Sequence, residues 1–164
     1  MNVFSRMVRG KLAGLAGTAS LDAVTYLDMA IRGRAPSELP DNMVRKLAEL
    51  AGCEQFAKPA EELDDKTRQQ RAGIAALLGY ADGAGSGVLF GLARPFMRGV
   101  PCFWAGIGLA GLTMLLSEGL AAKLGQTDPS SWPASAWIED IVPRCVYGWV
   151  TCFVYDRLEG SNDG

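Results

Sequence analysis

Three acidic residues stand inside long apolar stretches of the chain, and they are the first candidates for chemistry. Asp22, Asp82 and Glu118 lie within, or at the end of, segments made mostly of Ala, Leu, Gly and Val. A carboxylate in a helix that crosses a bilayer costs about 2.5 kcal/mol or more, so its presence there calls for a reason. Such a group can bind a cation or carry a proton, or it can hydrogen-bond a neighbouring helix and fix the packing. Both interpretations are kept open.

The neighbours of these acids in the sequence differ. Asp22 has Thr18 and Tyr26 one helical turn away on either side, and both side chains can donate a hydrogen bond. Asp82 stands beside a row of glycines, where a neighbouring helix can approach closely. Glu118 closes the most apolar segment and could reach the membrane interface. We therefore expect a polar site between helices, centred on Asp22 and Asp82, if these acids have a function.

The composition excludes several kinds of chemistry. The chain has no histidine, which removes Ser-His-Asp and Cys-His catalysis together with His-ligated zinc and haem. The sequence contains no recognisable pair of nucleophile and base, so we expect no enzyme activity. The net charge of −2 gives no electrostatic reason to expect a nucleic-acid partner.

The four cysteines carry little signal in the sequence. Cys145 and Cys152 are seven residues apart, about 10.5 Å along a helix, which is too far for them to share a metal ion. Cys53 and Cys102 have no close partner in sequence. We expect buried free thiols, and neither a metal nor a cofactor.

Four segments are candidates for membrane-spanning helices. The clearest, residues 99–117, contains 19 uncharged residues, which as a helix cover about 28 Å of a hydrocarbon core about 30 Å thick. Residues 72–93 contain one acid, and residues 12–31 contain two, of which Asp28 can pair with Arg32. Residues 137–155 are the weakest candidate, because charged residues occupy their first turns. Two of these, Asp140 and Arg144, are spaced i,i+4 and can neutralise each other. We expect residues 12–31 to be a retained span rather than a signal peptide.

Glycine is the main anomaly of the composition. The chain has 20 glycines in 164 residues, and four of them, Gly79, Gly83, Gly87 and Gly91, repeat every four residues. In water each interior glycine costs a helix about 1 kcal/mol relative to alanine. In a bilayer the helix persists, and small residues let two helices approach closely. The row therefore favours a membrane protein with a glycine-zipper interface over the alternative, a soluble helical bundle.

An internal repeat is suggested by two turns. Both residues 33–40 and residues 125–133 read Gly, two or three residues, then Pro-Ser-x-x-Pro. Each turn precedes an apolar stretch with a late glycine motif, at residues 87–90 and 148–151. We expect one membrane domain, residues 1–164, made of a duplicated two-helix unit. The two units cover about residues 10–95, with an inserted loop at 41–70, and residues 100–157.

The inserted loop has a helical pattern of its own. Its apolar residues fall on one face of a helix over residues 41–51, and Gly52 stops that helix. We expect an amphipathic helix on the membrane surface or packed on the bundle. Pro59 is expected to open a further helix that runs directly into the second apolar segment.

These features resemble those of small bacterial inner-membrane proteins of the YagU type. The resemblance rests on the glycine-rich segments, the Pro-Ser turn after the first of them, and the sequence Glu-Asp-Ile-Val-Pro-Arg-Cys-Val-Tyr-Gly at residues 139–148. That group often carries a histidine near Arg144 and Cys145, and this chain has none. The resemblance implies a location in the bacterial inner membrane and no established biochemical activity.

Two classes of function remain from the sequence. The first is a non-enzymatic helix-packing protein, either an accessory subunit of a larger membrane complex or a self-assembling homo-oligomer, with the glycine row as its interface. The second is a small transporter or an ion or proton channel built around the intramembrane acids. The first explains more of the sequence, because the small-residue row is longer than any pattern that the acids form.

Overall fold

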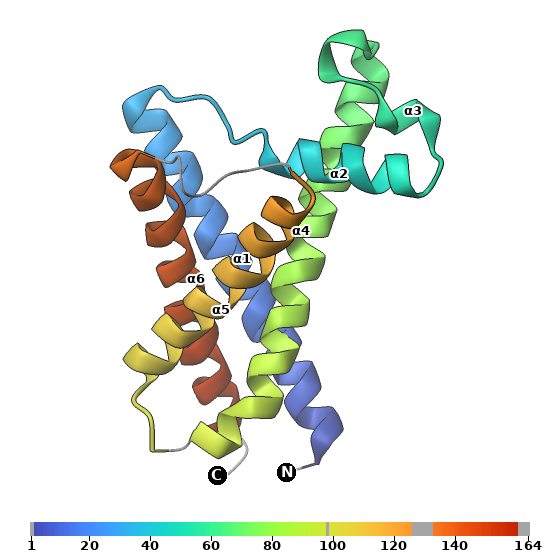
Figure 1. Ribbon diagram of the computed structural model, residues 1–164. Helices are drawn as coiled ribbons and strands as arrows, with labels where there is room; N and C mark the ends of the chain where they lie inside the picture. Colours follow the sequence, from blue (N-terminus) through green and yellow to red (C-terminus); the bar gives the residue numbers. More distant parts are fainter. Residues whose placement is uncertain (1, 98, 126–132, 161–164) are drawn as a thin grey trace.

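The computed structural model describes residues 2–97, 99–125 and 133–160, and within these ranges the chain is entirely helical (Figure 1). The elements follow one another as α1 Val3–Arg32, α2 Leu39–Leu50, α3 Glu54–Ala57, η1 Ala60–Glu62, α4 Asp65–Ala93, η2 Arg94–Met97, α5 Cys102–Lys123 and α6 Ala134–Gly160. The expected all-α class is confirmed.

Four helices are long enough to cross a bilayer. They have 30 (α1), 29 (α4), 22 (α5) and 27 (α6) residues, which correspond to about 33–45 Å. Two of the stretches examined are both long and apolar enough for a span by length and composition, Asp65–Met97 and Cys102–Lys123. In Figure 1 the four helices run alternately up and down, and the beginning of α1 lies at the same end of the bundle as the end of α6.

The helices pack as two crossed pairs that share one contact. α1 packs against α4, and α5 packs against α6. α1 also packs along α6, which joins the pairs, whereas α4 and α5 touch only slightly. Figure 1 shows that the two helices of each pair cross each other instead of lying parallel. Each pair combines helices from one of the two units expected from the sequence.

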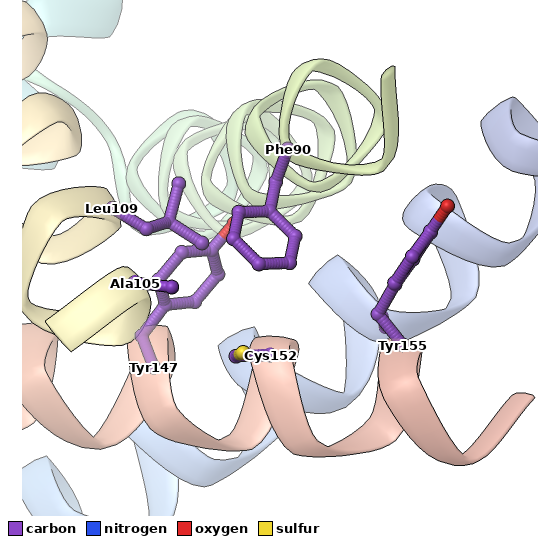
Figure 2. Packing of buried hydrophobic residues seen from close by; sticks show 7 residues of the cluster. Phe90, Ala105, Leu109, Tyr147, Cys152 and Tyr155 are labelled. Carbon is purple, nitrogen blue, oxygen red and sulfur yellow. The ribbon is translucent and has the colours of Figure 1, made fainter. Parts of the chain in front are cut away.

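The apolar core is small and is built largely around α6. Tyr147, Cys152 and Tyr155 of α6 pack with Phe90 of α4 and with residues of α5 and α1 (Figure 2). The rings of Phe90 and Tyr155 meet edge to face, with centroids 5.9 Å apart. Because the core is so thin, much of the apolar surface of the long helices faces outward.

The inserted loop folds onto the beginning of α4. Val44 of α2 is buried, whereas Leu50 on the same helix is 69% exposed. Arg71 of α4, which is fully buried, donates two hydrogen bonds to the carboxylate of Asp41, at 2.5 and 2.7 Å, and two more to backbone carbonyls of residues 56 and 58. One guanidinium therefore holds both ends of the α2–α3 segment against α4.

The start of α4 corrects one expectation. Pro59 precedes only the short 3-10 turn η1, and the long helix begins at Asp65. The Thr67 side chain hydrogen-bonds the carboxylate of Asp64, which holds the pKa of that carboxyl below its ordinary value. From Asp65 the helix continues through the charged stretch into the apolar segment without a break, as expected.

Ion pairs tie α1 to α6 at the end of the bundle where α1 ends and α6 begins. Asp28 binds Arg32 at 2.6 Å and Arg34 at 2.5 Å, and Arg32 binds Glu139 of α6 at 3.0 Å. The pairing of Asp28 with Arg32 was expected from their spacing. Of the second expected turn, residues 125–133, the part from 126 to 132 lies outside the described residues.

Candidate functional site

The three acids singled out in the sequence do not form one group. Asp22 lies at the contact of α1 with α4, where the Tyr80 side chain hydrogen-bonds it. Its expected partner Thr18 donates instead to the carbonyl of Gly14 at 3.0 Å, and Tyr26 is 63% exposed. Tyr80 comes from another helix, 58 residues later, and no local pattern indicated it.

Glu118 is part of a charged cluster between α5 and α6. Nη2 of Arg144 donates to Oε1 of Glu118 at 2.9 Å, and Nε of the same guanidinium binds Asp140 at 2.8 Å. The pairing of Asp140 with Arg144 was expected from their i,i+4 spacing. The pairing with Glu118 was not, because the partners stand 26 residues apart on two different helices.

Glu118 lies deeper than its position at the end of an apolar segment suggested. The residue is only 5% exposed, so it packs between helices instead of reaching outward. Its second oxygen, Oε2, is buried and has no hydrogen-bond partner among the described residues. A buried carboxylate oxygen without a hydrogen-bond donor destabilises the fold, so a proton or a cation bound at this atom would remove that cost.

Asp82 of α4 adds a further acid close to this cluster. It lies within electrostatic range of Arg144 and of the Tyr147 hydroxyl. The residue itself is exposed on the outer side of α4. The two carboxylates that bind the Arg144 guanidinium are those of Glu118 and Asp140, which leaves one excess negative charge in this cluster.

The glycine row of α4 faces α1 of the same chain. A Cβ placed on Gly87 would stand 2.6 Å from the Cα of Gly14, and one on Gly91 would stand 2.6 Å from the carbonyl oxygen of Arg6. A Cβ on Gly83 would instead meet the Thr18 side chain, with its Oγ1 as the nearest atom. Gly10 and Gly14 form the opposite side of this contact, a second row that we did not single out in the sequence although its spacing was visible.

Gly79 lies off this contact. A Cβ at that position would meet nothing within 4 Å. The reason is helical geometry, because four residues overshoot one turn by about 40°, so three such steps rotate the row by about 120° between Gly91 and Gly79. A repeat of four therefore stays on the α1 face for only two or three turns.

A second backbone contact joins α5 to α6. A Cβ on Gly148 would stand 2.8 Å from the carbonyl carbon of Gly106, and one on Gly106 would stand 3.0 Å from the same atom of Gly148. Gly148 was expected as part of the late glycine motif, whereas its pairing with Gly106 on another helix was not indicated by any local pattern. Gly108 and Gly111, on the same helix as Gly106, face open space.

Two tyrosines of α6 reach across to backbone carbonyls of α4. The Tyr147 hydroxyl donates to the carbonyl of Gly83 at 2.8 Å, and the Tyr155 hydroxyl donates to that of Gly91 at 3.0 Å. Both tyrosines are nearly or fully buried. Because residues eight apart lie on one helix face, the two bonds repeat the same α4–α6 contact two turns later.

Comparison of the chain with models of protein families, with curated proteins and with solved structures gave no match.

Proposed function

We propose that this chain is a non-enzymatic integral membrane protein of the bacterial inner membrane, in which α1, α4, α5 and α6 all cross the bilayer. The observation that carries the proposal is the outward face of α5. Phe103, Trp104, Leu115 and Leu116 are each more than half exposed, whereas Leu109 on the inner face is buried. Water-soluble monomers rarely expose apolar patches of this kind, whereas lipid covers them at no cost.

The same pattern extends to the other long helices. Large apolar side chains that are more than half exposed occur on α1 and α4 as well, and they include Phe4, Leu12, Leu27, Ile31, Leu77 and Leu89. An α-helix bonds its backbone groups internally, which a bilayer requires of any segment that crosses it, and Pro143 of α6 is the one interior proline among the described long helices. Two carboxylates of the crossing segments, Glu118 and Asp22, turn toward an arginine and a tyrosine, which lowers the cost of intramembrane charge. Asp82 is exposed.

Within this proposal the small residues hold the bundle together. Without a hydrophobic drive between helices in lipid, close backbone approach supplies much of the packing energy. Gly14 with Gly87 and Gly106 with Gly148 provide one such approach in each crossed pair. The chain then acts as a helix-packing component, and its exposed outer face is the surface for association with further copies or with a larger membrane complex.

The two glycine contacts also support the proposed duplication. Gly14 stands 19 residues before Gly33, and Gly106 stands 19 residues before Gly125, the glycine that begins the second turn. Their partners Gly87 and Gly148 each begin the late glycine motif of their unit. The close contacts thus fall at corresponding places in the two units.

Membrane integration can be tested by fractionation. We expect the chain to stay with the membrane after a carbonate wash and to float with lipid in a density gradient. Size determination in mild detergent or in lipid nanodiscs then gives the oligomeric state and any co-purifying protein. Release of the folded protein into the aqueous fraction by carbonate contradicts the proposal.

A second candidate function is favoured by one observation, the unpartnered oxygen of buried Glu118. Together with Asp82 it could take up a proton or a monovalent cation on a path through the bundle. Vesicles that contain the purified protein separate the two candidates. A packing component gives no cation or proton leak above that of empty liposomes, whereas a channel gives a leak that Glu118→Gln and Asp82→Asn abolish and that Asp22→Asn leaves unchanged.

A further inference from the structure

Two cysteines that are 50 residues apart in the sequence, Cys102 and Cys152, meet near one end of the bundle. Cys102 is the first residue of α5, and Cys152 lies on α6 with Asp156 one turn further on. The two Sγ atoms and a carboxylate oxygen of Asp156 all lie within 4.8 Å of one another. Cys152 is fully buried, and the other two are half-buried. Their approach depends on the crossing of α5 with α6, which sequence spacing does not reveal.

Arg94 binds the carboxylate of Asp156. The Nε and Nη2 atoms of Arg94 donate to the two carboxylate oxygens of Asp156 at 2.9 and 2.7 Å. The same guanidinium donates through Nη1 to the carbonyls of Met97 and Val100, at 3.1 and 2.9 Å. Arg94 therefore fixes both the Asp156 carboxylate and the backbone connection that leads into Cys102.

The chemistry of these three side chains matches a thiophilic divalent metal ion. Thiolates bind Zn²⁺ at about 2.3 Å and carboxylates at about 2.0–2.2 Å, so ligand atoms of a tetrahedral site lie somewhat under 4 Å apart. The Sγ of Cys152 and Oδ2 of Asp156 are already 3.8 Å apart. Ligands one turn apart on a helix, completed by a third from another element, are a common way to build such a site.

Charge balance supports the same assignment. Two thiolates and one carboxylate carry three negative charges, and the metal ion with the Arg94 guanidinium carries three positive charges. The assembly is neutral, which a poorly solvated position at the edge of an apolar bundle favours. We propose that Cys102, Cys152 and Asp156 bind one Zn²⁺ ion, with Arg94 orienting the carboxylate and a fourth position left for water or another ligand. This site is independent of the packing and transport proposals.

Cobalt provides a probe that reports on thiolate ligation directly. The full-length protein, purified in mild detergent with its thiols reduced and freed of metal, is titrated with Co²⁺. We expect thiolate-to-cobalt charge-transfer bands and the intense visible bands of tetrahedral cobalt, saturating at one ion per chain, and loss of these bands when Zn²⁺ is added.

Variants identify the ligands. Cys102→Ser and Cys152→Ser should abolish the charge-transfer bands, whereas Cys53→Ser and Cys145→Ser, outside the site, should leave them unchanged. Arg94→Gln should weaken cobalt binding by about 10–100-fold, as loss of a group that orients a ligand does. Circular dichroism of each variant shows whether it still folds. Because Cys102 is half-buried and Cys152 is buried, Cys102→Ser is the milder change and tests metal binding in a folded protein.

Three results overturn the proposal. One is the absence of cobalt bands in the folded, fully reduced protein, and another is their persistence in Cys102→Ser. The third is a Cys102–Cys152 disulfide that forms in air while the reduced protein binds no metal, since this would make the pair a redox couple. Because none of these measurements depends on membrane transport or on oligomeric state, failure here leaves the function proposed above untouched.

Discussion

Gly14 of α1 and Gly87 of α4 lie so close that a Cβ on Gly87 would stand 2.6 Å from the Cα of Gly14. The contact is between two backbones, so no flexible side chain can move aside to accommodate an added methyl group. This pair accounts for the conspicuous glycine row better than a contact with a second copy does, because α1 of the same chain already covers it.

The first prediction concerns this contact. Gly87→Ala should destabilise the protein by about 2–3 kcal/mol, since overpacking of a rigid contact costs about 1–3 kcal/mol and the backbone here cannot yield. Gly85→Ala, two residues away with open space around it, is the matched control and should change stability by less than about 0.5 kcal/mol. The free energy of unfolding, measured by denaturant titration in mixed micelles, checks both. Equal effects of the two substitutions would show that Gly87 is not at a close contact.

The corresponding pair in the second unit gives the second prediction. Gly106→Ala should destabilise the protein about as much as Gly87→Ala, because its Cβ would stand 3.0 Å from the backbone of Gly148. Gly108→Ala serves as control, since that position is open. A negligible effect of Gly106→Ala in the same unfolding assay would contradict the idea that both helix pairs are held by equivalent glycine contacts.

The buried ion pair gives the third prediction. Arg144→Met leaves Glu118 and Asp140 without their cation, and it should cost about 3 kcal/mol or more. Adding Glu118→Leu should recover at least about 1 kcal/mol of that loss, because the carboxylate that lacked a partner is removed as well. A double-mutant cycle on the unfolding free energy measures this coupling. Strictly additive effects would mean that the two side chains do not interact in the folded protein.

The tyrosine bonds across the bundle give the fourth prediction. Tyr147→Phe and Tyr155→Phe each remove one hydrogen bond to an α4 carbonyl and keep the ring. Each should cost about 0.6–1.7 kcal/mol, the range for hydrogen bonds between helices in membranes. Tyr26→Phe, at a largely exposed side chain, should have no measurable effect and controls for the loss of a hydroxyl. Identical stabilities of all three variants would rule out these bonds as contributors.

The sequence predicted the helices well because each depends mainly on local composition. The long apolar segments and the amphipathic pattern around Val44 each became helical, and the i,i+4 pairs Asp28–Arg32 and Asp140–Arg144 formed as their spacing indicated. Such features need only the geometry of one helix. The sequence could therefore give them without any knowledge of how the helices pack.

The partners between helices could not be predicted in the same way. Glu118 finds Arg144, and Cys102 finds Cys152, only because α5 crosses α6 at a particular place and rotation. Many crossings of apolar helices have similar energies, and the choice among them depends on small residues such as Gly106 that fit only one partner surface. The drift of the four-residue row away from α1 at Gly79 is a further consequence of where the helices cross.

Side-specific cysteine labelling shows whether all four long helices cross the membrane. Single cysteines are placed in a background without native cysteines, by the substitutions Phe4→Cys, Ser37→Cys, Gly99→Cys, Lys123→Cys and Gly160→Cys, all at exposed positions. A membrane-impermeant maleimide is then applied to intact cells and to inverted vesicles. Four crossings require Phe4, Gly99 and Gly160 to be labelled from one side, and Ser37 and Lys123 from the other. Labelling of Gly160 and Lys123 from the same side would mean that α6 does not cross, and labelling of all five positions from one side would contradict the account altogether.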